Sequence, residues 1–225
     1  MSTTHEVIEP RSATTGESVS IVAHRNRVGL WMLIAIDAAG SVSALVTYVY
    51  LWSLNVNSAW APPKNHFAPS GPFWLITLGA VVGAALLWWG WQLLRSRGRA
   101  ASSMAALAAL VVYIVTLVGQ IVQLSTFPFG PQDGAYASAT LWLCIFAAFH
   151  LALLIFLALG VFVRTRVGVI ARDNPSHARL VAMYATWVVV SIFLGALVAT
   201  AMTVSPNTKS PSFGEFKEPA ATSTP

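Results

Sequence analysis

The chain has 225 residues, of which 56% are hydrophobic and only 9% are charged, and its formal net charge is +5. A soluble domain carries about 25% charged residues. Buried helices of soluble proteins need apolar runs of about 10–14 residues, whereas runs of about 18 or more, long enough to cross a bilayer of about 30 Å, recur here. Composition therefore excludes a soluble globular fold, and the single cysteine, Cys144, excludes an intrachain disulfide and a cysteine-rich metal site.

Residues 1–24 are polar and rich in Ser and Thr, without the apolar stretch of a signal peptide. This composition predicts a disordered tail. The apolar runs that follow predict an all-α membrane domain over residues 25–203, because helices satisfy their own backbone hydrogen bonds in hydrocarbon. The five predicted spans are 28–54, 72–94, 102–124, 137–163 and 180–203. Residues 204–225 form a second predicted disordered tail.

Basic residues predict how these spans are oriented. Arginines precede the first span and occupy the loops between the second and third and between the fourth and fifth spans: Arg25, Arg27, Arg95, Arg97, Arg99, Arg164, Arg166, Arg172 and Arg179. The opposite side holds only Lys64 in its loops and Lys209 and Lys217 in the tail. Because cytoplasmic loops carry the Lys/Arg excess, we expect a cytoplasmic N-terminus and an outer C-terminus. This distribution also argues against a nucleic-acid partner.

Asp37 lies inside the first predicted span, about 15 Å from Arg27 at a helical rise of about 1.5 Å per residue. An ionised carboxylate at that depth costs about 2.5–3.5 kcal/mol, so it should face protein, a partner or water, or be protonated. Gly40 and Ser41 follow on the same helical face and predict close approach of another helix. Three roles stay open for Asp37: a structural hydrogen bond to a neighbouring helix, a proton-linked role, or lipid contact.

Other residues inside the spans favour packing over chemistry. Gly79 and Gly83 form a GxxxG pattern, which favours close helix packing. His150 lies mid-span without a second intramembrane histidine that would complete a haem or metal site, so we interpret it as a hydrogen-bonded packing residue. Gln120 and Gln123, near the outer end of the third span, are predicted to form hydrogen bonds between helices.

Neither a phosphate-binding glycine loop nor a nucleophile–base pair is recognisable in the sequence. We therefore expect no catalytic site, no metal and no cofactor bound by this chain itself.

Three stretches resemble the subunit III family of haem–copper oxidases (cytochrome c oxidase subunit 3). Residues 27–37, RVGLWMLIAID, are similar to the family's R-L-G-M-W-L-F-L-A-S-E, with Asp37 in place of its glutamate. Residues 133–138, DGAYAS, resemble D-G-x-Y-G-S, and counting on without gaps places F-H-G-L-H-V over 146–151, which keeps His150 but has Ala147 for the first histidine. Residues 123–127, QLSTF, are similar to Q-A-S-E-Y. The last span departs from the family pattern, because residues 184–187, YATW, lack the family's histidine and aspartate.

This resemblance covers about residues 25–203 and implies the short, five-helix architecture of the family. It implies an accessory, non-redox subunit of a respiratory terminal oxidase in the plasma membrane, which stabilises the catalytic subunit and supports proton uptake. Haem and copper would lie in catalytic subunit I, with subunit II alongside, and phospholipids would bind between the helices of this chain. Asp37 stands where the family keeps its intramembrane carboxyl group.

Two alternatives stay open. The first is the related accessory subunit of a nitric oxide reductase. The second, from another class, is a small proton-coupled transporter that uses Asp37 and His150, although no inverted repeat or broken helix pair is visible in the sequence. A haem-binding electron carrier is excluded, because the predicted spans contain one histidine, His150, and no second axial ligand of that kind.

Overall fold

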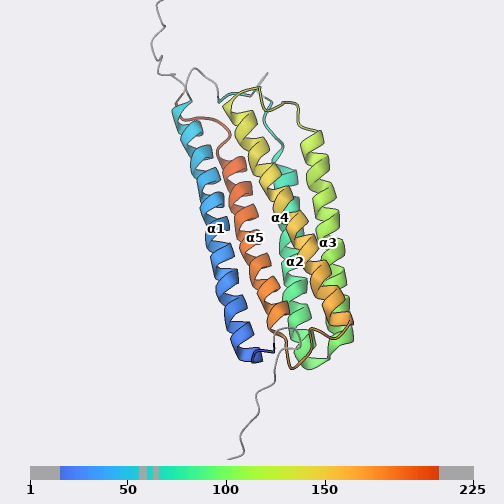
Figure 1. Ribbon diagram of the computed structural model, residues 1–225. Coiled ribbons are helices and arrows are strands. Elements are labelled where there is room, and N and C mark those ends of the chain that lie inside the picture. The colour runs from blue at the N-terminus through green and yellow to red at the C-terminus, as the bar shows by residue number, and fades with distance from the viewer. Residues whose placement is uncertain (1–15, 56–59, 63–65, 208–225) are drawn as a thin grey trace, which may run out of the picture.

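The computed structural model describes residues 16–55, 60–62 and 66–207, and these form a bundle of five long helices (Figure 1). The helices are α1 (Val19–Leu54), α2 (Ser70–Ser96), α3 (Arg99–Ser125), α4 (Ala135–Arg166) and α5 (Ser176–Ala201). Each is long and apolar enough to cross a membrane. The predicted all-α fold and its five spans are therefore confirmed, and the chain is a multi-pass membrane protein.

The helices extend beyond the predicted spans, most of all at the start of α1. This helix begins at Val19 and not at residue 28, with Ser18 as its N-cap, whose hydroxyl accepts from the Ile21 backbone N–H. Arg25 forms an ion pair of 3.0 Å with Glu17. Residues 19–24, predicted as part of a disordered tail, are therefore helical, because a capped helix can continue in water after hydropathy has ended. The rest of that predicted tail, residues 1–15, lies outside the described residues.

The chain after α5 folds back onto the end of α1. The Trp52 indole N–H donates to the carbonyl of Val204 at 2.8 Å, and the Ser205 hydroxyl donates to the carbonyl of Trp52 at 2.7 Å. The Trp60 indole donates to the carbonyl of Thr203 at 2.8 Å. Residues 204–207 therefore pack against the bundle, whereas the predicted tail over 208–225, with Lys209 and Lys217, lies outside the described residues, as does Lys64.

The two ends of the bundle differ in chemistry. We call the end that holds the α2–α3 and α4–α5 connections the arginine end, and the end where α1 finishes and α2 begins the Trp60 end (Figure 1). At the arginine end, Arg95 and Arg179 lie over the Trp91 ring, 5.3 and 5.6 Å from its centroid. Arg172 donates to the carbonyl of Ser96 at 3.1 Å. That the arginine end faces the cytoplasm stays a prediction.

Helix α1 is the least enclosed element of the bundle. It packs mainly against α4 and α5, at one edge of the bundle in Figure 1. Only Ser41 and Tyr48 of its residues are buried. Each of the helices α2 to α5, in contrast, buries about one side chain or more per turn against its neighbours. Most of its surface is therefore available to lipid or to another protein.

The GxxxG pattern of α2 lies directly against α3. A methyl group built on Gly79 would overlap the Thr116 side chain, and one built on Gly83 would overlap the Tyr113 ring. The two glycines thus let α2 and α3 approach more closely than any residue with a Cβ would allow, which matches the small-residue packing common in membrane helices.

We expect Gly83→Ala to lower the stability of the bundle by about 1–3 kcal/mol, because the added methyl group must displace a buried ring. Gly160→Ala in α4 is the matched control, since nothing lies within 4 Å of the Cβ position there. That change should be neutral or stabilising by up to about 1 kcal/mol, the gain in helix propensity. Thermal unfolding of both variants in detergent measures the difference, and equal midpoints would contradict the packing described here.

Candidate functional site

The two ionisable residues in the middle of the bundle form one pair. His150 Nε2 of α4 lies 3.0 Å from Oδ1 and 2.9 Å from Oδ2 of Asp37, on α1. The His150 side chain is 1% exposed and that of Asp37 is 14% exposed, so water is largely kept from the contact. Ionisable groups at membrane depth commonly pair with one another, and this geometry is an example.

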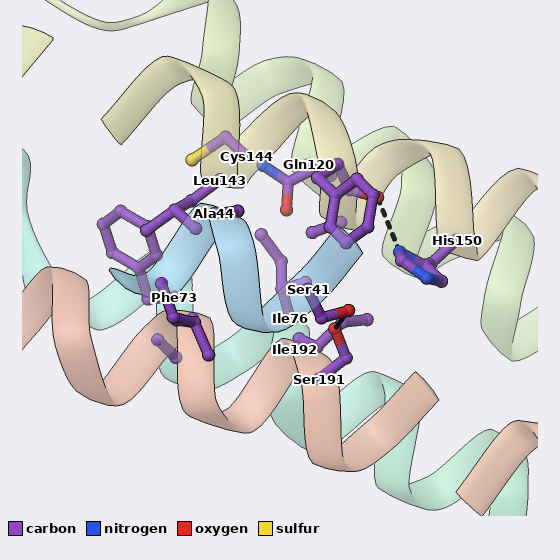
Figure 2. A pocket seen from close by; sticks show the side chains of 15 residues that line it. Ser41, Ala44, Phe73, Ile76, Gln120, Leu143, Cys144, His150, Ser191 and Ile192 are labelled. Carbon is purple, nitrogen blue, oxygen red and sulfur yellow. Dashed lines mark hydrogen bonds between the residues drawn. The ribbon is translucent and has the colours of Figure 1, made fainter. Parts of the chain in front are cut away.

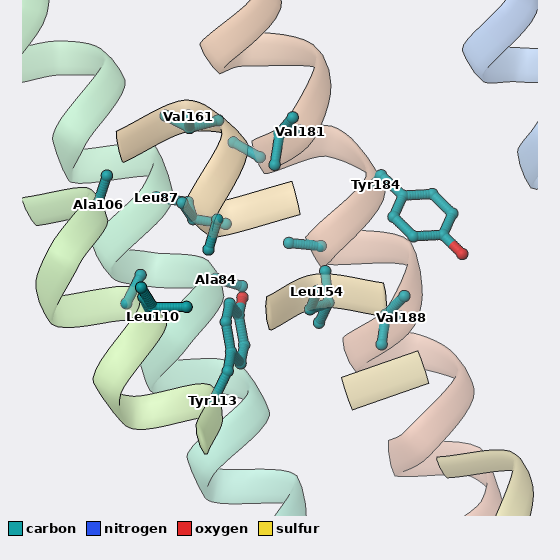
Figure 3. Close-up of a cluster of buried hydrophobic side chains, with 14 of the residues drawn as sticks. Ala84, Leu87, Ala106, Leu110, Tyr113, Leu154, Val161, Val181, Tyr184 and Val188 are labelled. Carbon is teal, nitrogen blue, oxygen red and sulfur yellow. The ribbon is translucent and has the colours of Figure 1, made fainter. Parts of the chain in front are cut away.

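Helix α5 contributes two further side chains to the same carboxyl group. The Trp187 indole N–H donates to Asp37 Oδ2 at 2.7 Å. The Tyr184 phenol, one turn earlier, also interacts with Asp37, and Figure 3 shows its ring pointing away from the surrounding apolar side chains. Asp37 is therefore the point at which α1, α4 and α5 are joined by polar contacts.

The hydrogen-bond geometry fixes which ring nitrogen of His150 carries a hydrogen. His150 Nδ1 lies 2.9 Å from the carbonyl oxygen of Phe146, and a carbonyl only accepts, so Nδ1 must carry a hydrogen. Nε2 then either donates to an ionised Asp37 or accepts from a protonated one. In both arrangements one proton is shared between the two groups and their net charge is zero. This neutrality lowers the cost of placing Asp37 in hydrocarbon.

The residues after Asp37 on α1 face α5 and α4. The hydroxyls of Ser41 and Ser191 form a buried hydrogen bond of 3.0 Å between α1 and α5. Gly40 is exposed, and a Cβ at its position would lie 3.9 Å from the Phe146 ring, an ordinary contact. Of the two predicted packing residues, Ser41 thus lies at a helix–helix contact and Gly40 at its rim.

A small cavity of about 30 Å³ lies beside the Asp37–His150 pair. Its polar lining consists of Ser41, Gln120, Cys144, His150 and Ser191, and Figure 2 shows these side chains converging from four helices. A cavity needs about 10–15 Å³ and two to four polar partners to hold a water molecule. The cavity meets both conditions.

The two glutamines differ in part from their predicted role as interhelical hydrogen-bonders. Gln120 donates to Gln123 at 3.2 Å, and because the two residues are three apart, this bond lies within α3. Gln120 also interacts with the Cys144 thiol on α4. The Gln123 side-chain nitrogen is buried without a partner among the described residues. Gln123 is therefore not seen to join two helices.

Within residues 16–55, 60–62 and 66–207, no group of three His, Cys, Asp or Glu side chains is placed to hold a metal ion. The chemistry that the site offers is the holding and exchange of one proton by Asp37 and His150, beside a cavity large enough for water.

Comparison with known proteins adds no identification, since neither a family model nor a curated protein matches this chain. Membership of the subunit III family therefore stays a prediction from the quoted stretches.

Sequence reasoning singled out Asp37 and His150 but missed that they meet. The signal that could have found the contact is that they are the only Asp, Glu, Lys, Arg or His residues in the five predicted spans, and such groups pair in membranes. Trp187 and Tyr184 were missed as partners of Asp37. Aromatic residues are common in membrane helices, so the sequence gives no signal for that role.

We expect Asp37→Asn to cost no more than about 1 kcal/mol, because interhelical hydrogen bonds average about 0.6 kcal/mol and the amide can keep both contacts. Its nitrogen can donate to a neutral His150, and its oxygen can accept from Trp187. Asp37→Leu removes the partner of the His150 ring nitrogen, the Trp187 indole and the Tyr184 hydroxyl, at about 1–3 kcal/mol for each group left unpaired. Unfolding of both variants in detergent measures the difference. Equal damage by Asn and Leu would mean that charge, and not hydrogen bonding, holds the contact.

Proposed function

We propose that the chain is an accessory, non-redox membrane subunit of a respiratory terminal oxidase, which packs against the catalytic subunit in the plasma membrane. One observation carries this proposal. The stretches at residues 27–37 and 133–151 resemble separate parts of the subunit III family, and the acid of the first lies against the histidine of the second. Asp37 and His150 are 113 residues apart in the chain and are in contact in the fold. This contact between two positions that resemble the family supports a common origin of this chain and the subunit III family.

The exposed surface of α1 supports a role in assembly. Its side chains include Trp31, Met32 and Ile36, which are 55%, 63% and 74% exposed. This apolar surface suits a catalytic subunit or membrane lipids, including bound phospholipid. In this proposal haem and copper belong to catalytic subunit I, with subunit II alongside, and this chain supplies neither redox ligands nor a nucleophile.

The Asp37–His150 pair gives the accessory subunit a way to support proton uptake. It holds one proton at no net charge, and it can release or regain that proton by charging only one of its members. Such a group can store a proton between turnovers of a partner.

Two other functions remain as alternatives. An accessory subunit of a nitric oxide reductase would have the same fold and the same pair. Only the identity of the partner protein that purifies with the chain distinguishes this alternative from the oxidase subunit. A small proton-coupled transporter is favoured by one specific observation, the water-sized polar cavity beside the pair. Proton-driven uptake by the purified chain in liposomes would support the transporter.

Gentle detergent purification of the tagged chain should recover a haem–copper catalytic subunit in stoichiometric amount, because an accessory subunit is held by its partner's apolar surface. The isolated chain should show no haem absorbance band. Asp37→Asn should assemble normally and change turnover modestly at most. Recovery of a nitric oxide reductase would replace the proposal by its first alternative, and a stoichiometric haem band from the isolated chain would falsify the non-redox role.

A further inference from the structure

A row of buried polar side chains follows α4 from the Trp60 end to the middle of the bundle. Tyr136, Thr140, Cys144 and His150 are each at most 2% exposed. They occupy one inward band of the helix and extend over about 21 Å at a rise of about 1.5 Å per residue. The row ends at the Asp37–His150 pair, so the pair is its inner terminus.

The row is connected at its outer end to the loop before α2. The Tyr136 hydroxyl accepts from the backbone N–H of Ala68 at 2.9 Å. The hydroxyls of Tyr136 and of Tyr48 on α1 both lie near the Thr140 hydroxyl. Cys144 lines the cavity together with His150. Polar groups therefore occur at intervals from the loop to the pair, and the cavity, whose wall also includes Leu143, Phe146 and Ala147, spans the interval between Cys144 and His150.

One member of this row, Thr140, and its neighbour Tyr48 on α1 have buried hydroxyls that form no well-formed hydrogen bond within the described part of the chain. The hydroxyls of Tyr48 and Thr140 face each other, yet neither meets the geometry of a hydrogen bond to any described residue. A buried hydroxyl without a partner costs free energy, and in hydrocarbon no lipid atom relieves it. Ordered water is the usual partner of such groups. Together with the water-sized cavity, the unpaired hydroxyls of Tyr48 and Thr140 indicate that water molecules lie along this row of side chains.

Apolar clusters lie in both halves of the bundle: the one toward the Trp60 end includes Trp60, Phe73 and Leu143 and surrounds the row, and the one toward the arginine end is larger. Below the pair, the inward residues of α4 are Leu151, Leu154, Ala158 and Val161, and those of α5 include Val181, Ala182 and Ala185. They form one apolar cluster with α2 and α3, part of which Figure 3 shows. Tyr113 and Tyr184 are its polar members, and the buried hydroxyl of Tyr113 has no partner among the described residues. This cluster separates the pair from the arginine end.

We propose that a hydrated polar path runs from the Trp60 end to the Asp37–His150 pair, and that the pair exchanges its proton with that side only. Water is the ligand of the path, held by Tyr136, Tyr48, Thr140, the cavity and His150. With the predicted orientation, this is the outer side of the membrane. The titratable groups that face the pair and the path are Tyr184 on α5, Cys144 and Tyr136 on α4, and Tyr48 on α1. The path stands independently of which complex the chain joins.

Cys144 is a built-in probe of the path, because it lines the cavity and is the only cysteine of the chain. Silver ion is small, does not cross membranes readily in chloride-free buffer and reacts with thiols that water reaches. The full chain in sealed vesicles of each orientation is exposed to Ag⁺ on one side, denatured, and labelled with a maleimide. Thiols that have reacted with Ag⁺ stay unlabelled.

The control is Ala158→Cys in a Cys144→Ser background, which places the cysteine in the apolar cluster. Cys144 should react at least about tenfold faster than this control, because a thiol in a dry core reacts only after local opening. Should Ala158→Cys fail to fold, Leu154→Cys takes its place. Thr140→Val, which keeps the shape but removes a hydroxyl, should slow the reaction of Cys144 several-fold.

The side of reaction decides the proposal. Reaction from the side that holds the α3–α4 connection, residues 126–134, is the expected result. Reaction from the arginine end, or equal rates for Cys144 and the control, would overturn it. These outcomes do not depend on an oxidase partner, so the path and the proposed function succeed or fail separately.

Discussion

The contact between Asp37 and His150 is the constraint on which the position of α1 in the bundle depends. A lone carboxylate in hydrocarbon costs about 2.5–3.5 kcal/mol, and a neutral pair with its hydrogen bonds filled avoids most of that cost. Helix α1 buries few other residues, so the pair, the Trp187 N–H and the Ser41–Ser191 hydrogen bond fix which face of α1 meets the bundle. Apolar packing alone would not determine which face of α1 meets the bundle, because contacts with lipid are as favourable for Leu and Val as contacts with another helix.

The pair also divides the interior of the bundle. Toward the Trp60 end, buried polar side chains, unpaired hydroxyls and a cavity lie within a smaller apolar cluster, and toward the arginine end lies a larger apolar cluster. A group that exchanges protons needs water on at least one side, and one that must not leak protons needs a dry barrier on the other. This arrangement suits an accessory subunit that stores a proton, and it suits the alternative of a transporter only if a conformational change opens the apolar half.

The sequence predicts the features of this structure that depend on hydropathy, but not those that depend on capping or on how the helices pack. The five spans were predictable because hydrocarbon excludes unpaired backbone groups, whereas helix ends such as Val19 depend on capping in water, which hydropathy does not report. Asp37 and His150 were recognisable as polar groups at membrane depth, but their contact depends on how α1 and α4 pack. The path was missed because Tyr48 and Thr140 are ordinary residues of membrane helices until their burial and missing partners are known.

A double-mutant cycle on Asp37 and His150 tests the central claim most directly. Asp37→Ala, His150→Ala and the double variant are unfolded in detergent, and the coupling free energy is taken from the three changes in stability. Groups in one buried contact are coupled by about 0.5–3 kcal/mol, so the double variant should be more stable than the sum of the single effects predicts. Additive effects, within about 0.3–0.5 kcal/mol, would contradict the claim that this pair holds α1 to the bundle.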